Sequence, residues 1–243
     1  QDISLPKAAK VLIIGGGVVG CSVAYHLAKL GWRDVLLLER KQLTSGTTWH
    51  AAGLIAQLRA TQNMTRLAKY SQELYTSLEA ETGVATGFRQ NGSITAALSD
   101  ARMEELRRGA AMARAFGVEI EEITSSEIAD HYPGLNVSDC KGGVFLAKDG
   151  QADPVNITQA LAKGARANGA KIIEGIKVTG ITTKDGAVAG VSTENGDITA
   201  EYVVNCGGMW ARDIGKMAGV SVPLQACEHF YIVTEQIPNL KRD

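Results

Sequence analysis

The sequence has few of the features that would mark it as anything other than an ordinary globular protein. Its 243 residues include only 5 prolines and no proline- or serine-rich linker, and 25 Lys and Arg nearly balance 26 Asp and Glu. No strong field of one sign therefore exists to recruit nucleic acid or an anionic membrane. The 45% apolar content is enough for a substantial core in one large or two interleaved domains. We expect the partners to be small molecules or other proteins.

Cysteine is scarce, and the four cysteines form no CxxC pair and no spacing typical of metal ligands. Two of them lie inside apolar segments, which predicts buried free thiols in a reducing compartment and no bound metal. The four residues are Cys21, Cys140, Cys206 and Cys227.

The sequence also lacks an uninterrupted apolar run. The longest apolar stretch is broken by a glycine cluster and by His26 and Lys29, so it is unsuited to crossing a bilayer. No cleavable signal peptide is expected before it. The expected location is the cytoplasm in a bacterium, or the mitochondrial matrix if the protein is eukaryotic.

What the chain does contain, near its start, is the pattern of a strand, a turn and a helix. Residues 11–14 form a short apolar run typical of a central parallel strand, and residues 18–30 have helical spacing. A second apolar strand is predicted at residues 35–38. The segment therefore predicts a βαβ unit.

The glycines of this unit match a dinucleotide-binding fingerprint. Gly15 would make the turn, Gly17 would let the backbone approach a pyrophosphate, and Gly20 would let helix and strand pack closely. The phosphates would sit at the start of the helix, where N–H groups and the helix dipole favour anions. Glu39 follows Gly20 by 39 − 20 = 19 positions, where its carboxylate can accept both ribose hydroxyl protons. At this point NAD and FAD both remain open.

The later chain favours FAD. Asp153-Pro154 predicts the start of a helix that runs to Asn168, and a strand is expected at residues 171–174. Three strand-like runs follow, with the hairpin dipeptides Asp185-Gly186 and Asn195-Gly196 between them. They predict a three-stranded antiparallel meander inserted in the parallel sheet, a feature that a minimal NAD domain lacks. The runs are residues 178–183, 188–194 and 198–204.

A second glycine pair, Gly207-Gly208, ends the last of these strands, and a helix is predicted from Trp210 to Ala218. With this segment the sequence resembles the dimethylglycine/sarcosine dehydrogenase and oxidase family, within the D-amino-acid-oxidase-like superfamily of FAD oxidoreductases. The matching stretches are the glycine fingerprint with Glu39, "SGTTWHAAGL" (45–54), "VVNCGGMWARDIG" (203–215) and "EHFYIVTE" (228–235).

The resemblance implies an α/β fold, in which an FAD-binding Rossmann-type parallel sheet with the inserted meander is joined to part of a mixed-sheet substrate domain. The expected FAD-binding domain is discontinuous, over residues 1–85 and 142–220, and the first part of the substrate domain covers residues 86–141 and 221–243. The expected cofactor-binding residues are Gly15, Gly17, Val18, Val19, Gly20, Glu39, Arg40, Ser45, Thr47, Thr48, His50, Ala52, Gly53, Leu54, Val178, Cys206, Gly207 and Trp210.

His50 has the most specific implied role, a covalent histidyl bond to the 8α carbon of the flavin. The small polar residues at positions 44–48 can open a helix at the pyrophosphate, and their side chains would then run along the cofactor. A neutral imidazole there can attack the electrophilic methyl carbon of an oxidised flavin tautomer.

The resemblance also makes His229 an active-site histidine. It starts an alternating run, residues 230–234, that predicts a substrate-domain strand crossing above the flavin, and Tyr231 would share its face. A protonated amine has no lone pair to drive C–H cleavage, so the site must bind or generate the neutral amine before hydride passes to flavin N5. His229 would accept or guide that proton. Hydrolysis of the resulting iminium ion releases formaldehyde, unless a folate captures the one-carbon unit.

The middle of the chain should form the first half of the substrate domain. Helices are expected at residues 64–82 and 101–116, and a short helix should begin at the Thr124-x-x-Glu127 capping box. Strands are expected at residues 93–97, 119–123 and 144–146 in a mixed sheet. Arg59 and Arg89 are candidates to grip a substrate carboxylate, although surface roles are favoured.

Relative to the family, the chain lacks an expected catalytic tyrosine, the last glycine-containing segment and the frequent C-terminal folate-binding region. It is therefore expected to be a fragment, or to be completed by another chain, with tetrahydrofolate bound only on the missing region. The substrate would be a small methylated amine such as dimethylglycine or sarcosine. The electron acceptor, oxygen or an electron-transferring flavoprotein, stays open. The alternatives are another oxidase of the superfamily, acting on an amino acid or glycerol phosphate, and a non-catalytic flavin-binding regulatory subunit.

Overall fold

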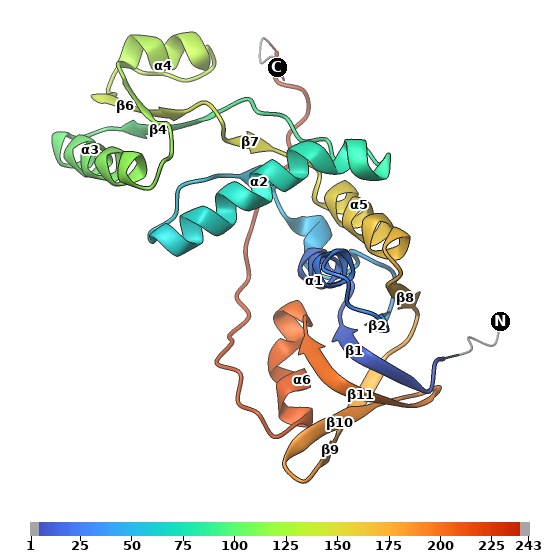
Figure 1. Cartoon of the computed structure of the whole chain (residues 1–243). Helices are drawn as coiled ribbons and strands as arrows, with labels where there is room; N and C mark the ends of the chain where they lie inside the picture. The colour runs from blue at the N-terminus through green and yellow to red at the C-terminus, as the bar shows by residue number, and fades with distance from the viewer. Residues whose placement is uncertain (1–4, 239–243) are drawn as a thin grey trace. The chain divides into compact units, whose positions relative to one another are not determined.

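The structure is a computed structural model that describes residues 5–238 (Figure 1). These residues form two compact units. The first comprises residues 5–52, 77–86 and 153–228, and the second comprises residues 53–76, 87–152 and 229–238. The units divide the chain differently from the expected domains, because residues 53–76 and 142–152 belong to the second unit.

A six-stranded sheet forms the centre of the first unit. The strand order is β8-β2-β1-β11-β10-β9. The first four strands in this order are parallel to one another, whereas β10 runs antiparallel to both β9 and β11. The prediction of a parallel sheet with an inserted antiparallel meander is thus confirmed. The strands are β1 (Ala8–Ile14), β2 (Val35–Glu39), β8 (Lys171–Glu174), β9 (Val178–Lys184), β10 (Ala187–Thr193) and β11 (Gly196–Asn205).

The two hairpins of the meander turn in different ways. Asp185 and Gly186 both have positive φ, 52° and 79°, as a type I′ turn requires. At the other hairpin only the glycine, Gly196, has positive φ, and the Thr193 hydroxyl accepts from the Asn195 N–H and donates to the Gly196 carbonyl. Both expected hairpin dipeptides therefore occur at turns.

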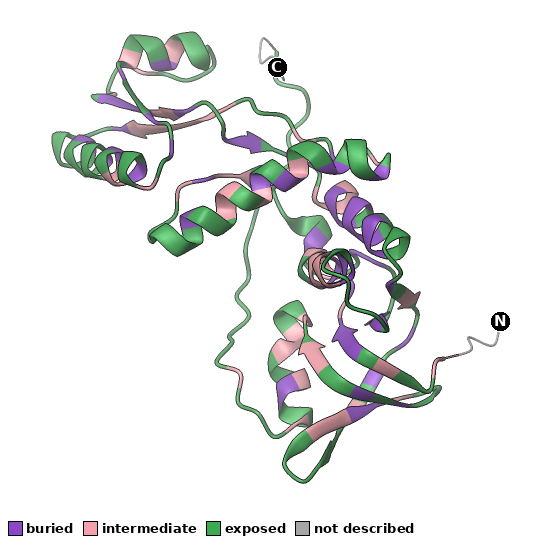
Figure 2. Cartoon of the chain, in the orientation of Figure 1, coloured by how far each residue is buried: buried purple, intermediate pink, exposed green. Residues whose placement is uncertain are grey.

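Helices cover the two faces of this sheet. On one face α1 (Val18–Lys29) packs against α5 (Pro154–Ala167), with the fully buried Tyr25 ring beside Gly164. On the other face Leu12, Ile14, Leu36 and Leu38 form a cluster that Ile214 of α6 (Ala211–Met217) contacts. Because side chains alternate along a strand, Ile13 and Leu37 face α1 and α5. Figure 2 shows buried residues along these strands and helices.

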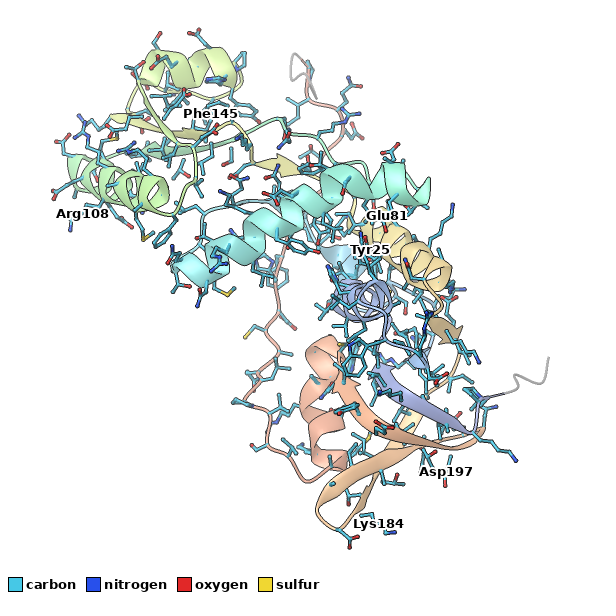
Figure 3. All side chains as sticks on the ribbon, viewed as in Figure 1. Tyr25, Glu81, Arg108, Phe145, Lys184 and Asp197 are labelled. Carbon is cyan, nitrogen blue, oxygen red and sulfur yellow. The ribbon has the colours of Figure 1, made fainter. Side chains whose placement is uncertain are left out.

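The last turns of α2 (Gln62–Thr82) belong to the first unit. The Tyr25 hydroxyl lies 2.7 Å from Glu81 Oε2 (Figure 3). Lys29 Nζ lies 2.8 Å from the same oxygen. Hydrogen bonding to Lys29 lowers the pKa of Glu81, and the same contact raises the pKa of Lys29. This cluster ties the last turns of α2 to α1 within the first unit.

The second unit contains a three-stranded sheet of order β4-β6-β5 and a two-stranded pair, β3-β7. All pairings in both are antiparallel. The expected strands at 93–97, 119–123 and 144–146 thus occur, the last two with shifted starts, and the β3-β7 pair was not anticipated. The elements are β3 (Leu54–Ile55), β4 (Ser93–Ala97), α3 (Asp100–Ala115), β5 (Glu121–Ile123), α4 (Ser125–His131), β6 (Gly142–Leu146) and β7 (Gly150–Gln151).

The predicted strand at residues 230–234 is wrong. This segment contains no helix or strand, and its side chains are exposed. An alternating sequence only becomes a strand when a neighbour satisfies its backbone N–H and C=O groups. The residues that the structure describes supply no such partner.

Candidate functional site

A cavity of about 490 Å³ lies in the first unit, where the parallel strands β1, β2 and β11 end. The strand order reverses direction at β1, whose neighbours are β2 and β11, and such a switch point is where ligands bind in open α/β sheets. Many of the expected cofactor residues line the cavity: Gly15, Gly17, Val18, Val19, Glu39, Arg40, Ser45, Thr47, Thr48, Val178, Cys206, Gly207 and Trp210.

The glycines of the β1–α1 turn are required by geometry. Gly15 has φ +112°, and a Cβ there would lie 2.4 Å from the Cys206 carbonyl oxygen. A Cβ on Gly20 would lie 1.9 Å from the Gly15 carbonyl oxygen. Neither position can carry a side chain without moving backbone. The predicted turn and close-packing roles are therefore confirmed, although Gly20 lies behind the turn and does not line the cavity.

A threonine from a distant loop caps the start of α1. Gly17 is the N-cap residue and supplies no side-chain bond, whereas Thr48 Oγ1 accepts the Val18 N–H at 3.1 Å. A threonine hydroxyl that accepts one hydrogen bond still has a proton to donate. The cavity wall at the start of α1 thus combines the helix dipole with a fixed hydroxyl donor, which suits a phosphate. The helix expected around residues 44–48 is only a 3₁₀ turn, Thr48–His50 (η1).

Glu39 is held rigidly at the end of β2. Its side chain is buried, with Oε2 accepting the Gly16 N–H at 2.7 Å and Oε1 accepting the Lys41 N–H at 2.9 Å. Each carboxylate oxygen has a further acceptor position. The arrangement fits a diol beside the cavity, and together with the glycine turn it fits the nucleotide half of FAD.

The β11–α6 loop forms the opposite wall. Asn205 organises it, because its Oδ1 accepts the Gly207 N–H at 3.1 Å and its Nδ2 donates to the Ala211 carbonyl at 2.8 Å. This loop presents Trp210, and the Arg40 guanidinium carbon lies 4.0 Å from the centre of the Trp210 ring. The guanidinium thus lies over the indole ring, and both side chains line the cavity.

The two cysteines near the fingerprint are poor nucleophiles. Burial raises the pKa of Cys206 to about 11 and that of Cys21 to about 12. All four cysteines are free thiols, as expected, but only Cys21 is buried. Cys140 and Cys206 are partly exposed and Cys227 is exposed, so the expectation of buried thiols holds only for Cys21.

Several expected residues do not line the cavity. His50 and Ala52 are exposed, and the His50 ring lies against Trp49, tilted by 35° with 3.7 Å between ring centres. Gly53 and Leu54 belong to the second unit. The histidyl link to flavin is therefore a prediction that the site geometry leaves untested.

His229 and Tyr231 lie in the second unit, in the exposed segment that follows α6. Tyr231 is 57% exposed. Since residues 230–234 form no strand, the shared face that period two predicts for these side chains does not exist here. Their catalytic roles stay predictions.

Several residues that line the cavity were not expected from the sequence. Ile14 and Asn205 end β1 and β11, Leu38 is the last residue but one of β2, and Ile176 and Lys177 form the connection into β9. The first three could have been found from the rule that parallel strands gather their carboxyl ends at one edge. The β8–β9 connection could not, because its position depends on the order of strands in the sheet.

Among residues 5–238, no helix is long and apolar enough to span a bilayer. No group of three or more His, Cys, Asp or Glu side chains in the same range is placed to hold a metal ion.

Comparison with known proteins places the chain among flavoenzymes. The family model described as FAD dependent oxidoreductase matches residues 10–243. Human mitochondrial sarcosine dehydrogenase is 44% identical over 243 residues, covering 98% of this chain and 26% of that protein. The mouse mitochondrial pyruvate dehydrogenase phosphatase regulatory subunit (96% of this chain, 27% of that protein) and mouse mitochondrial dimethylglycine dehydrogenase (96% and 27%) are each 40% identical.

Among solved structures, L-proline dehydrogenase from P. horikoshii superposes with a TM-score of 0.85 at 32% identity. That match covers 89% of this chain and 57% of the other. The chain spans about a quarter of the length of each of the three curated relatives named above.

Proposed function

This chain belongs to the FAD dependent oxidoreductase family, and from that premise we propose that it forms the dinucleotide-binding part of an enzyme that oxidatively demethylates a small methylated amino acid. The observation that carries the proposal is the glycine-lined cavity with Glu39 at its edge, in a chain 44% identical to a sarcosine dehydrogenase. Dimethylglycine and sarcosine are the proposed substrates.

Different residues of the cavity suit chemically different parts of the cofactor. The start of α1 and the Thr48 hydroxyl would hold the pyrophosphate, and the Glu39 carboxylate would accept the ribose hydroxyl protons. When bound, FAD supplies a two-electron acceptor for C–H oxidation. The protein's own task is to hold the nucleotide half fixed and to present a neutral amine.

His50 is proposed to attach the flavin covalently. The support is its place in the "TWHAAG" segment, two residues after the Thr48 hydroxyl that caps α1, and the exposure of its imidazole. Denaturing the purified protein in acid should leave yellow, fluorescent material on the polypeptide, and His50→Ser should release it. His26→Gln is the matched control, because that side chain bonds within α1 and should leave attachment intact. Complete release of flavin from the unaltered protein would refute the link.

His229 is proposed to receive or guide the amine proton, and Tyr231 to line the substrate pocket. The support is the "EHFYIVTE" segment and the exposure of both side chains. His229→Gln should lower turnover at least tenfold with flavin content unchanged. His131→Gln, whose ring stacks on Phe145 in the second unit, is the control and should leave turnover unchanged. Normal turnover in His229→Gln would remove it from the reaction.

The substrate class is tested by anaerobic mixing of the flavin-loaded protein with dimethylglycine, sarcosine, alanine and glycerol 3-phosphate. The methylated amines should bleach the flavin absorbance fastest. Trimethylglycine is the negative control. Its quaternary nitrogen has no proton to lose and so cannot gain a lone pair, and the compound should cause no bleaching. Faster bleaching by alanine or glycerol 3-phosphate would favour another oxidase of the superfamily instead.

A regulatory subunit is the second candidate, favoured by the 40% identity to the mouse phosphatase regulatory subunit. It predicts bound flavin that no amine bleaches.

The electron acceptor is proposed to be an electron-transferring flavoprotein or oxygen. The rate at which each reoxidises the reduced flavin will distinguish them. Formaldehyde release would be suppressed by tetrahydrofolate if a folate-binding region accompanies this chain. The mitochondrial names of three relatives favour the matrix if the source is eukaryotic.

A further inference from the structure

We propose that Arg40 and Trp210 form a stacking platform for the adenine base, so that affinity for the nucleotide depends on the flat shape of the guanidinium and not on its charge. The inference rests on the proposed binding of FAD and concerns how one end of it is recognised.

The platform is built from three separate segments. The Arg40 guanidinium lies 4.0 Å from the centre of the Trp210 ring, and both residues line the cavity. A Cβ on Gly46 would lie 3.3 Å from the Trp210 ring, so the indole rests closely against the Gly46 backbone. The ring is therefore supported by backbone and covered by the guanidinium.

The second face of Arg40 is accessible. Arg40 is an exposed residue, and no ion pair in the part of the chain that the structure describes involves it. A guanidinium is planar and weakly hydrated, and it stacks on aromatic rings through either face. A flat base can therefore lie on the outer face to give an indole–guanidinium–base ladder.

The position selects adenine over the other parts of FAD. Arg40 follows Glu39 directly, and the Glu39 carboxylate is held by the Gly16 N–H at the turn that begins α1. A ribose on Glu39 and a pyrophosphate at the start of α1 leave the base on the far side of the ribose, where Arg40 and Trp210 lie. The isoalloxazine would have to leave in the opposite direction, beyond the pyrophosphate.

The test measures reversible binding, not turnover. In a His50→Ser background, flavin-free purified protein is titrated with ADP, which carries the adenine, and with FMN, which does not. Arg40→Met and Arg40→Lys should each weaken ADP binding about tenfold, because lysine keeps the charge but not the plane. FMN binding should change less than twofold in both.

Two further variants make the result specific. Trp210→Phe keeps an aromatic platform, so ADP should still bind, but the change in tryptophan fluorescence on adding ADP should disappear. Lys10→Met removes a second cation–ring pair, Lys10 over Trp32 at 5.4 Å, whose residues do not line the cavity, and it should leave ADP binding unchanged.

Wild-type ADP affinity in Arg40→Lys would overturn the proposal, because Arg40 would then act through charge on the pyrophosphate. Equal weakening of ADP and FMN, or no ADP binding to the unaltered protein, would also overturn it. The proposed amine oxidation stands separately: bleaching of saturating FAD by sarcosine in Arg40→Met would support that function whatever the ADP result.

Discussion

Hydrogen bonds to the backbone hold individual side chains of the first unit in place beside the cavity. Cys206 lines the cavity, and Thr48, Glu39 and Asn205 are each fixed by hydrogen bonds to backbone. Fixed groups lose little conformational entropy when a ligand arrives. The site residues are therefore preorganised one by one, mostly by backbone partners distant in sequence.

The cysteines should react with alkylating agents in order of exposure. At pH 8, a thiol with a pKa of about 11 is roughly one part in a thousand thiolate, and only the thiolate is nucleophilic. We expect iodoacetamide to modify the exposed Cys227 first, Cys206 much later and Cys21 last, as followed by peptide mass spectrometry. In denaturant all four should react alike. Labelling of Cys206 at the rate of Cys227 in the folded protein would contradict the burial seen here.

Glu81→Gln should cost about 1 kcal/mol of unfolding free energy at pH 7, because it removes the charge that Lys29 and Tyr25 share. The pKa of Glu81 is lowered, so its contribution is present above its ordinary value of 4.5 and is lost as pH falls below it. Urea unfolding at pH 7 and pH 3 should show the difference shrinking in acid. Glu104→Gln, which breaks the exposed Arg108 pair of α3, should change stability by less than 0.5 kcal/mol. A difference between Glu81→Gln and the unaltered protein that persists at pH 3 would point to packing instead of charge.

At the scale of helices and strands, the local sequence was enough to predict an element where turn residues or capping residues mark its ends. Strand β4 and strand β8 were predicted to the residue, because short runs of strand-forming residues are bounded by turn residues. The expected caps also form: Asp153 accepts two N–H groups of α5, and Thr124 and Glu127 make a capping box. These caps depend only on residues two or three apart.

Pairing between distant segments could not be obtained in the same way. Residues 230–234 are aromatic or β-branched, as strand residues often are, but β9 has β10 beside it and the later segment has no described partner. The same limit applies to the site. The fingerprint located Gly15 and Glu39, whereas Lys177 joins the cavity only because β8 lies at the far side of β2. Strand order is a property of the sheet that no single segment contains.

Two glycine-to-alanine changes in helices should have opposite effects. Gly20→Ala in α1 would put a methyl group 1.9 Å from the Gly15 carbonyl, so we expect a loss of about 2–3 kcal/mol and weaker flavin binding. Gly109→Ala in α3 meets no atom within 4 Å and should gain about 0.5–1 kcal/mol through helix propensity. Thermal unfolding with and without FAD measures both. A Gly20→Ala protein as stable as the parent would show that α1 can shift from β1 without penalty.

The whole molecule consists of two units that each have a separate hydrophobic cluster. In the first unit Leu12, Leu36 and Ile198 belong to one cluster, and in the second Met103 and Val144 belong to another. All the residues that line the cavity belong to the first unit. A nucleotide that binds there raises the free energy of unfolding of that unit alone, provided that the two units unfold independently.

Hydrogen exchange with ADP tests this independence. At 100 times the dissociation constant, ADP should add about 2.7 kcal/mol to the opening free energy of the first unit, which slows exchange there about a hundredfold. Peptides covering residues 11–20 and 203–211 should show this slowing, whereas a peptide covering β4, in the second unit, should exchange as before. Arg40→Met should need about ten times more ADP for the same protection. Equal slowing of exchange in β4 would mean that the two units unfold together, because a ligand bound to the first unit would then stabilise both.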